Sequence, residues 1–316
     1  METSTSCNLC GGQNFEPFAT RRGNLTAHVF TIVRCTGCSL VFTNPRLDAT
    51  ENDALYEEDY FRGEGFDDSV KYLRLDEEAR ARRDESLAIV DKIRALQPSR
   101  HARILDVGCG AGSFLKTLRD EGYTRIEGLE LSRFGAAHAE RVSGVRVHQG
   151  ELDKVTLPEA HYDVVNATEV VEHVRDPMAF FTKVRRILAP GGIFVYSTGN
   201  ERGIYARILG ERWPYLVPEG HLFYFNPRTI DAYFRAVGLE PVRADAKTRF
   251  RLRSAEARIA HAQLLYVGQS APGLKGLLFR TVARLDVSPM RHLVSEVVGK
   301  GALAIGRRPD GRVGRA

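Results

Sequence analysis

Four of the five cysteines fall into two close pairs, a spacing typical of a metal site. Cys7 and Cys10 form one C-x-x-C pair, and Cys35 and Cys38 form another, with 24 residues between the pairs. Two such pairs can supply four thiolates to a tetrahedral zinc ion. Disulfide frameworks belong mainly to small secreted domains, so they explain the pairs less well. We expect structural zinc, with redox-active pairs or accidental spacing as the alternatives.

A glycine-rich turn follows an apolar run in the segment ILDVGCGAGSF. Gly108, Gly110 and Gly112 have the spacing G-x-G-x-G, whereas the dinucleotide fingerprint would need a further glycine where Ser113 stands. Such a turn lets backbone approach a ligand at a helix N-terminus. Asp106, at the end of the run, suits a cationic or hydrogen-donating ligand better than a pyrophosphate. The sequence therefore favours a ligand other than a dinucleotide, and a purely structural turn is the alternative.

Acidic and histidine side chains gather in the segment ATEVVEHVRDP, and a further histidine lies in PEGHLFYFNP. We expect Glu169, Glu172 and His173 to share one side of a helical turn, with His221 at the same edge of the sheet. Two carboxylates and two imidazoles can hold a divalent cation such as Mg²⁺. Alternatively, His221 alone acts as a general base while Glu169 touches the cofactor. Wholly structural roles are the third possibility.

Alternating short apolar runs and amphipathic stretches predict an α/β fold with a parallel sheet. Helices are expected after the N-cap Asp176, with Gly191 past the helix end, and over 227–237. A connecting helix before Pro98 carries an apolar stripe of Ile89, Ile93 and Leu96. The expected strands are 103–108, 125–131, 145–149, 162–168 and 192–198, with two more near 239–244 and 302–308.

From Arg103 to Gly192 the chain resembles class I S-adenosylmethionine-dependent methyltransferases, most specifically in LDVGCGAG. The resemblance implies a Rossmann-like seven-stranded sheet with helices on both faces. It also implies that the three glycines pass under the cofactor and that Asp106 places its amino-acid end. Glu130 matches the acid that accepts hydrogen bonds from the ribose hydroxyls. Further cofactor contacts are implied for Leu131, Glu151, Leu152, Thr168 and Glu169.

The E-x-x-E-H pattern followed by a distant histidine resembles ubiquinone-biosynthesis O-methyltransferases and small-RNA terminal 2′-O-methyltransferases. In those families, the resemblance implies, a metal held by two acids and two histidines lowers the pKa of the hydroxyl to be methylated. Sugar carbon methyltransferases also resemble the chain and use a Glu-His pair. In this chain Gly220, not a glutamate, directly precedes His221, which argues against such a pair. Glu219 is the next residue before Gly220. Tyr56 and Tyr60 are similar to tyrosines of these relatives, and Tyr60 is a candidate for reaching the acceptor.

The segment WPYLVPEGHLFYF is typical of a loop that covers a substrate. Trp213, Tyr215, Phe223 and Tyr224 could stack on a sugar or an aromatic ring, or they could pack in the core. The sequence does not separate these two roles.

The composition of the chain excludes several classes of protein. The 316 residues are 43% hydrophobic and 27% charged, which excludes disordered, collagen-like and coiled-coil chains. No apolar run reaches the length of a membrane span, and the first twenty residues contain no signal-peptide core, so we expect a cytoplasmic protein. The net charge of +5 is uneven, because residues 240–316 hold 15 basic and 6 acidic side chains. That tail could meet phosphates, or it could be a solvated helix face.

The chain divides into three stretches, the last of which contains an insertion. Residues 1–45 are an expected zinc ribbon, 46–100 an aromatic and charged segment with a connecting helix, and 101–316 the cofactor-binding domain. Within that domain, about 250–300 is a helical insertion. Its part 273–298 could lie on a membrane bearing a lipid-linked acceptor, although a cap over the sheet or a dimer contact fits better.

The leading function is methyl transfer to a hydroxyl, or less favourably a carbon, of a small-molecule or sugar acceptor. An RNA 2′-O-methyltransferase is the second hypothesis, and salt-dependent retention of RNA would support it. A noncatalytic scaffold that binds zinc and S-adenosylmethionine is the third. The sequence does not define the acceptor or the oligomeric state.

Overall fold

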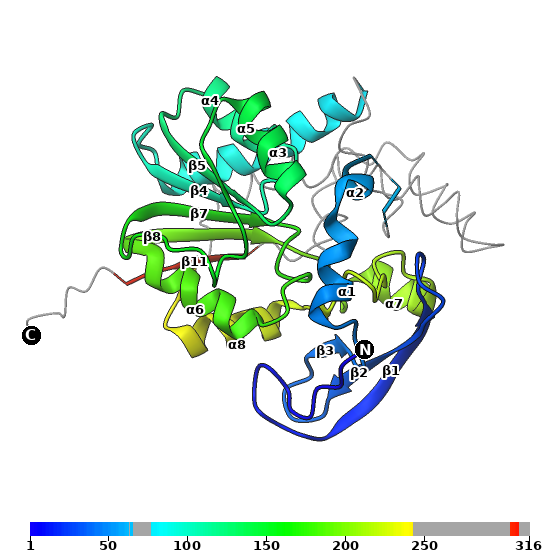
Figure 1. Cartoon of the computed structure of the whole chain (residues 1–316). Helices are drawn as coiled ribbons and strands as arrows, with labels where there is room; N and C mark the ends of the chain where they lie inside the picture. The colour runs from blue at the N-terminus through cyan, green and yellow to red at the C-terminus, as the bar shows by residue number, and fades with distance from the viewer. Residues whose placement is uncertain (63, 66–76, 243–303, 310–316) are drawn as a thin grey trace, which may run out of the picture.

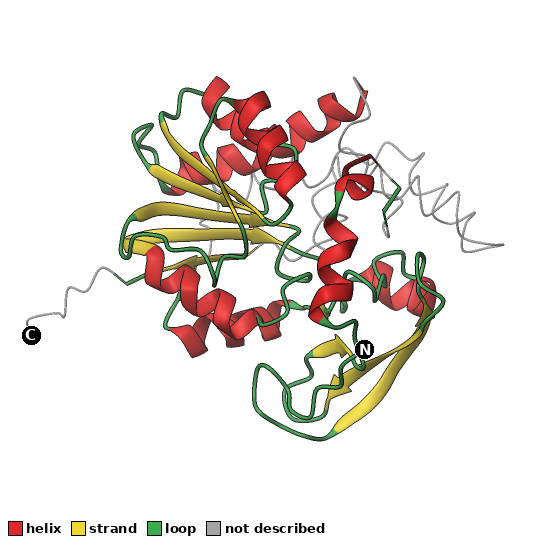
Figure 2. Cartoon of the chain, viewed as in Figure 1, coloured by secondary structure: helices red, strands yellow, loops and turns green. Residues whose placement is uncertain are grey.

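The computed structural model describes residues 1–62, 64–65, 77–242 and 304–309, which fold into two sheets with helices around them (Figures 1 and 2). The predicted insertion at about 250–300, including 273–298, lies outside the described residues. Within the described part, no helix combines the length and the apolar character needed to cross a membrane.

The larger sheet has seven strands in the order β10-β11-β8-β7-β4-β5-β6. The neighbours from β8 to β6 run parallel, while β11 is antiparallel to both β8 and β10. This confirms the predicted α/β class and the expected seven-stranded sheet. The strands are β4 (Arg103–Val107), β5 (Arg125–Glu130), β6 (Val147–Gln149), β7 (Tyr162–Thr168), β8 (Leu188–Ser197), β10 (Glu240–Pro241) and β11 (Ala304–Arg307).

Helices cover both faces of this sheet, as Figure 2 shows. Side chains alternate along the buried strands, so that Ile104 packs in one core cluster while its neighbour Leu105 packs in the other. The first cluster also contains Val90 of α3, whereas the second contains Phe181 of α6. On the first side lie α3 (Glu77–Leu96), α4 (Ser113–Asp120) and α5 (Arg133–Ser143), and on the second lie α6 (Pro177–Ile187) and α8 (Pro227–Val237).

The capped helices begin where the sequence predicts, but α6 ends early. Asp176 accepts a hydrogen bond from the N–H of Ala179 at 3.0 Å, which caps the helix start. The helix was expected to run almost to Gly191, yet it stops at Ile187. Leu188 already pairs with Tyr162 in β7, so sheet pairing ends the helix before the glycine is reached.

The N-terminal sheet is antiparallel and takes its fourth strand from far along the chain. Its order is β1-β2-β3-β9, and Phe42 pairs with Phe223. Phe223 and Tyr224 were expected in a substrate-covering loop, but they form this buried edge strand. The predicted boundary at residue 45 therefore does not enclose a self-contained sheet. The strands are β1 (Phe15–Arg22), β2 (Val29–Cys35), β3 (Val41–Thr43) and β9 (Phe223–Tyr224).

Short helices connect the two sheets, and one apolar core runs between them. Val33 and Phe42 of the N-terminal sheet, and Cys7 before it, belong to the same cluster as Phe194 of β8 and Tyr233 of α8. The ribbon is thus packed against the larger sheet rather than tethered to it. The connecting helices are α1 (Ala49–Asp53), η1 (Ala54–Tyr56), α2 (Glu58–Arg62), α7 (Ile204–Leu209) and η2 (Gly210–Arg212).

Candidate active site

The glycine turn joins the carboxyl end of β4 to the start of α4, as the sequence predicts. Gly108, Gly110 and Gly112 have φ of 66°, 53° and 83°, which is the left-handed region that favours glycine. At Gly112 a Cβ atom would stand 2.8 Å from the Cα of Ala139 in α5. The turn therefore needs glycine both for its backbone and for its close approach to α5.

Two buried carboxylates flank this turn. Asp106 accepts a hydrogen bond from the side-chain amide of Asn166 at 2.7 Å, and burial raises its pKa to about 7. Glu130 ends β5 and accepts backbone hydrogen bonds from Gly110 at 2.9 Å and Ser132 at 3.0 Å. Burial raises the pKa of Glu130 as well, while these N–H groups oppose the shift. Both acids lie at the carboxyl edge of the sheet, as the sequence predicts.

The other residues expected to contact a cofactor are spread along the same edge. Leu131 and Thr168 are half-buried, and Thr168 follows Asn166 at the end of β7. Glu151 pairs with Lys154 on the surface side of its loop. Leu152 is 4% exposed and packs in the main core. Their contacts with a cofactor stay predictions.

Glu172, His173 and His221 come together as expected, but not on a helix. One ligand atom from each lies within 4.8 Å of the others. Residues 169–173 are a non-helical turn, although a turn of helix was expected there. Glu169 has a φ of 53°, which is outside the helical region. Glu169 is exposed and falls outside this three-residue cluster, so the structure does not gather the four expected ligands as one group.

Tyr215 connects Glu169 to the cluster. Its hydroxyl contacts a carboxylate oxygen of Glu172 and lies 3.1 Å from one of Glu169. It also accepts the N–H of Gly199 at 2.7 Å, and its ring lies 4.2 Å from that of His221. The aromatic segment suggested stacking on an acceptor for this tyrosine. The structure instead turns its hydroxyl towards the two acids.

Backbone carbonyls fix the tautomers of both histidines. Nδ1 of His221 lies 2.7 Å from the carbonyl oxygen of Tyr215, and Nδ1 of His173 lies 2.9 Å from that of Gly220. Because a carbonyl oxygen only accepts, each Nδ1 carries a proton, and in the neutral ring Nε2 then carries the lone pair. Nδ1 held in this way is the usual support for a histidine that binds a metal or accepts a proton through Nε2.

Of the two tyrosines, Tyr56 reaches the cluster, because its hydroxyl lies 2.9 Å from Nδ1 of His173. Tyr60, the expected candidate, is buried and packs edge-on against Tyr56 with ring centroids 5.3 Å apart. The sequence singled out both tyrosines, but their order within the site depends on how α2 packs, which spacing alone does not reveal.

Glu219 does not form a Glu-His pair with His221, although its position in the sequence suggested one. It is completely buried, and its carboxylate accepts backbone N–H groups from Asn24 at 2.6 Å and Thr26 at 2.6 Å. These groups belong to the turn between β1 and β2. Glu219 therefore fastens the ribbon hairpin to the segment that carries His221, and no sequence signal marks such a long-range contact.

The ribbon also holds the backbone around the cluster. The hydroxyl of Thr43 in β3 donates to the carbonyl of His221 at 3.1 Å. The N–H of Leu222 donates to the carbonyl of Glu172 at 2.7 Å. The turn after β7 and the segment leading into β9 are thus fixed to one another and to the N-terminal sheet.

The four paired cysteines form a second cluster, away from the glycine turn. Sγ of Cys7 lies 3.5 Å from Sγ of Cys38, and Sγ of Cys10 lies 3.6 Å from Sγ of Cys35. All four sulfurs lie within 4.8 Å of one another. Tetrahedral zinc with bonds of about 2.3 Å needs sulfurs about 3.8 Å apart. The cluster has the size and donor set for such an ion.

A family model for the methyltransferase domain matches residues 79–244, which is just over half of the chain. The chain belongs to this methyltransferase family. The matched range contains the glycine turn, both flanking acids and the Glu172–His173–His221 cluster. This bears out the class I S-adenosylmethionine-dependent methyltransferase resemblance that the glycine motif indicated.

Similar proteins carry related names. The methyltransferase domain is 34% identical over 162 residues to a ubiquinone biosynthesis O-methyltransferase of Cereibacter sphaeroides, covering 46% of this chain and 63% of that protein. It is 28% identical over 164 residues to the protein of that name from Ralstonia nicotianae, covering 48% and 68%. The chain thus spans less than two thirds of the first of these relatives.

A solved structure supports the fold of this methyltransferase. It is a chain from the complex between the Haloferax volcanii Trm112 methyltransferase activator and a putative methyltransferase. The TM-score is 0.51 at 18% identity, covering 74% of this chain and 95% of that one. At this identity the likeness concerns the arrangement of elements alone.

Proposed function

We propose that the chain transfers the methyl group of S-adenosylmethionine to a hydroxyl group of a small-molecule or sugar acceptor. The observation that carries this proposal is that the glycine turn follows the carboxyl end of β4, while Glu172 and His173 follow that of its neighbour β7 and are joined there by His221. A cofactor over the turn would direct its methyl group towards the cluster. The names of the similar O-methyltransferases support oxygen over carbon as the accepting atom.

The residues around the turn fit the cofactor by their chemistry. The glycines keep side chains away from the surface on which a nucleoside would lie, and Asp106 offers a carboxylate to its cationic amino-acid end. Glu130 offers a two-oxygen acceptor to the ribose hydroxyls. When bound, S-adenosylmethionine supplies a methyl group on a sulfonium that departs readily. The protein then has to align the acceptor and remove its hydroxyl proton.

The cluster can remove that proton in either of two ways. In the first, His221 accepts it at Nε2 as a general base. In the second, Glu172, His173 and His221 hold a divalent cation such as Mg²⁺, which lowers the pKa of a bound hydroxyl. One observation supports a ligand here: Oε2 of Glu172 is buried without a hydrogen bond from any described residue. A cation or an acceptor hydroxyl would satisfy this oxygen.

We also propose that the cysteine cluster holds structural zinc. The sulfur separations support a tetrahedral site, and a small antiparallel sheet buries too little apolar surface to fold firmly by itself. The ribbon would then contribute to activity by position, because Glu219 and Thr43 link it to the segment of His221.

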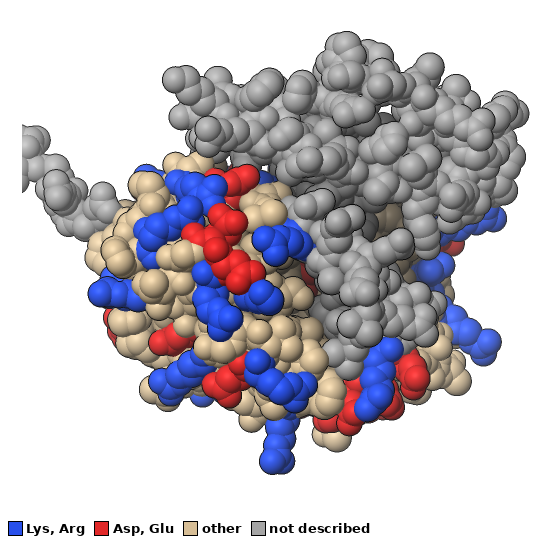
Figure 3. All heavy atoms as spheres, turned by 90° about the horizontal axis from the view of Figure 1, so that it is seen from above, with Lys and Arg blue, Asp and Glu red and all other residues tan. Residues whose placement is uncertain are grey.

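RNA methylation is a second candidate, favoured by the metal-like cluster and the ribbon. On the described part of the face in Figure 3, basic side chains are interspersed with acidic ones, which supports a small acceptor over a phosphate backbone. A noncatalytic scaffold is the third candidate. It would bind S-adenosylmethionine without transferring its methyl group to any acceptor.

A methyl-transfer assay with radiolabelled S-adenosylmethionine tests the proposal. The acceptors are 3,4-dihydroxybenzoate, a panel of free sugars and a short RNA, each assayed with Mg²⁺ and with a chelator. We expect transfer to a small acceptor, at least about 100-fold slower in His221→Gln, since losing a general base or metal ligand costs that much or more. Binding of S-adenosylmethionine, measured by calorimetry, should stay within about twofold.

His161→Gln is the matched control, because His161 precedes β7 at the opposite edge of the sheet. It should change neither transfer nor cofactor binding. Loss of activity in chelator, restored by Mg²⁺, supports the metal mechanism, whereas equal activity in chelator supports His221 as base. Cofactor binding without transfer to any acceptor would favour the scaffold, and transfer to RNA alone would favour the second candidate.

A further inference from the structure

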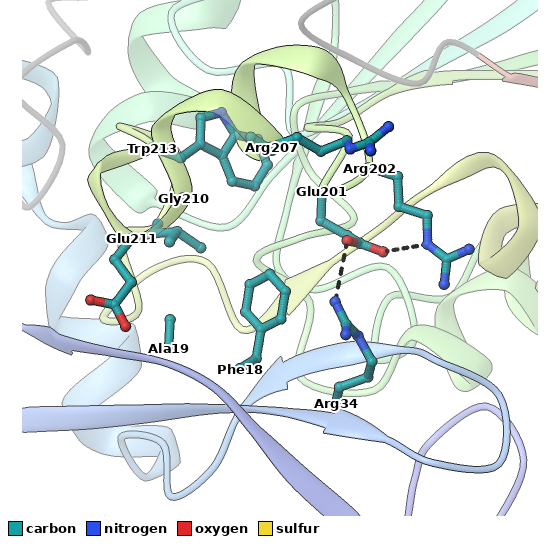
Figure 4. Close-up of a pocket in the computed structure, with 11 residues that line it drawn as sticks. Phe18, Ala19, Arg34, Glu201, Arg202, Arg207, Gly210, Glu211 and Trp213 are labelled. Atoms are coloured by element: carbon teal, nitrogen blue, oxygen red, sulfur yellow. Dashed lines mark hydrogen bonds and ion pairs between the residues drawn. The ribbon is translucent and has the colours of Figure 1, made fainter. Parts of the chain in front are cut away.

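A pocket of about 500 Å³ lies between the ribbon sheet and the segment 201–216 (Figure 4). Phe18 and Ala19 of β1 and Arg34 of β2 line it from the ribbon side. Residues from α7 and η2, including Trp213 just beyond them, line it from the other side. Neither the cofactor turn nor the cysteine cluster contributes to its walls.

One end of the pocket is positively charged. Arg34, Arg202 and Arg207 lie on the same side in Figure 4, around the buried carboxylate of Glu201. Glu201 lies 3.3 Å from Nε of Arg202 and 3.9 Å from a terminal nitrogen of Arg34. Its side chain also accepts a hydrogen bond from Asn226 at 2.7 Å. A single carboxylate therefore faces three guanidinium groups at this end.

The positive end retains capacity for an anion. Among the described residues, Arg207 has no ion-pair partner. Nε of Arg34 is buried without a described hydrogen-bond partner, although the same side chain also lies 3.6 Å from the exposed Glu16. Planar guanidinium groups pair especially well with carboxylates and phosphates. The second acid of the lining, Glu211, lies at the opposite end of the pocket in Figure 4.

Aromatic rings form the middle of the pocket. Phe18 and Trp213 lie between the arginine end and Glu211 (Figure 4). The guanidinium of Arg34 also stacks over Phe18, 4.7 Å from the ring centroid. Surfaces of this kind contact a flat or apolar ring, and the neighbouring cations hold a negative group on that ring.

The pocket shares an aromatic wall with the candidate active site. Trp213 stacks on Tyr215 with ring centroids 5.1 Å apart, and Tyr215 lies 4.2 Å from His221. A ligand in the pocket therefore sits behind the rings that border the Glu172–His173–His221 cluster. This adjacency suits the non-reacting part of an acceptor better than an unrelated effector.

We propose that this pocket binds the non-reacting end of the acceptor, and that this end is an apolar or aromatic ring bearing a carboxylate or phosphate group. The pocket stands on its own residues, but its assignment to the acceptor rests on the proposed methyl transfer. It narrows the substrate class from small molecules and sugars in general to acceptors with an anionic end.

Trp213 is the one tryptophan of the chain and lines this pocket, so its fluorescence should change when a ligand binds there. We would titrate the full chain with phenyl phosphate and benzoate, and with phenol and inorganic phosphate as probes of each half. We expect a saturable change with phenyl phosphate or benzoate at a dissociation constant at least about tenfold lower than with phenol or phosphate alone. The stronger of the two ring anions identifies the anionic group as phosphate or carboxylate.

We call the tighter-binding of phenyl phosphate and benzoate the ring-anion probe. Arg207→Gln should lower the affinity for this probe by at least about fivefold, whereas Arg212→Gln should change it by no more than about twofold. Arg212 is its matched control, since it is an exposed arginine of the adjoining η2 outside the pocket lining. Equal loss in both variants, equal affinity for phenol and phenyl phosphate, or no saturable signal would each overturn the site.

Calorimetry with S-adenosylmethionine on the same proteins separates this inference from the proposed function. Cofactor binding without probe binding refutes the pocket and leaves methyl transfer standing. Probe binding without cofactor binding supports the pocket and refutes its assignment to a methyl acceptor. With both intact, a ring-anion probe that inhibits methyl transfer competitively against the acceptor supports the whole proposal, and one that leaves transfer unchanged at saturation overturns that assignment.

Discussion

At the scale of single residues, the site depends on carboxylates held away from water. Asp106, Glu130 and Glu172 are all buried, and each has a raised pKa because burial disfavours its charged form. Backbone N–H groups and the amide of Asn166 offset part of that effect at Asp106 and Glu130. A cationic ligand at such a place gains from charges that the fold has already oriented.

The affinity for S-adenosylmethionine should depend on pH through Asp106. Its pKa is about 7 in the folded protein, so below pH 7 the carboxyl is mostly protonated and a cationic ligand must displace that proton. We expect affinity to increase by up to about tenfold between pH 6 and pH 8, with proton release on binding at pH 6. Calorimetry in buffers of different ionisation enthalpy measures both quantities.

Asp106→Asn is the test of that assignment. The variant should bind the cofactor more weakly at pH 8 and lose most of the pH dependence, because its side chain does not titrate. A wild-type affinity that stays constant from pH 6 to pH 8, or an unchanged pH profile in the variant, would contradict the role given to Asp106.

At the scale of elements, close packing of the turn against α5 decides which residue can stand there. Gly112 is the N-cap of α4 in a left-handed conformation, and a Cβ atom there would stand 2.8 Å from the Cα of Ala139. Gly122, after the end of α4, has a similar φ of 85° but nothing within 4 Å of a Cβ atom. The two glycines share a backbone requirement and differ in the space around them.

Gly112→Ala should destabilise the protein more than Gly122→Ala. Both variants carry the left-handed cost of about 1 kcal/mol, but only the first also pushes a methyl group against the backbone of α5. We expect an additional loss of about 1–3 kcal/mol for Gly112→Ala, measured by denaturant unfolding. Equal losses in the two variants would show that the contact with Ala139 relaxes freely.

At the scale of the whole molecule, the ribbon and the larger sheet behave as one packed body. Asn8, inside the first cysteine pair, donates to Asp176 at 2.8 Å and accepts from the N–H of Met178 at 3.0 Å, at the start of α6. The buried Glu219 joins the ribbon hairpin to the site from the other side. Disruption of the four-cysteine cluster should therefore also destabilise the methyltransferase domain.

Zinc removal should lower the stability of the entire chain in a single transition. Wild-type protein should contain about one zinc per chain, and Cys35→Ser should lose it. A ligand at a hundredfold excess over its dissociation constant stabilises the folded state by about 3 kcal/mol, so the loss should be at least that large. Elemental analysis and thermal unfolding measure the two effects.

Cys109→Ser provides the matched control, because Cys109 is buried in the glycine turn and lies outside the four-cysteine cluster. It should keep its zinc. Separate unfolding steps in metal-free protein, with the larger domain unshifted, would contradict the shared core.

Local patterns in the sequence were sufficient for the elements that are decided locally. The glycine turn, the acids at strand ends and the capped start of α6 each depend on a few consecutive residues. The end of α6 was mispredicted. Gly191 suggested that the helix continues almost to that residue, but Leu188 already pairs with Tyr162 in the sheet. The turn at 169–173 likewise took a shape that helical spacing did not predict.

Contacts across the chain could not be predicted in this way. The hydroxyl of Tyr215 among the acids, Glu219 on the hairpin and the choice of Tyr56 at His173 all depend on how distant segments pack. The pocket beside Trp213 depends on the same packing, because its walls come from the ribbon and from residues after β8. The sequence shows which residue types are present in these segments, but not which residues they contact in the folded chain.

The N-terminal sheet cannot be completed until β9 has been synthesised, because β9 is its fourth strand. The inner edge of the N-terminal sheet pairs with residues about 180 positions later, so that edge stays open while most of the chain is still emerging from the ribosome. Early metal capture would close the cysteine knuckles without completing the sheet. Premature termination between Thr43 and Phe223 would then leave a metal-loaded fragment with an uncovered strand, which favours aggregation.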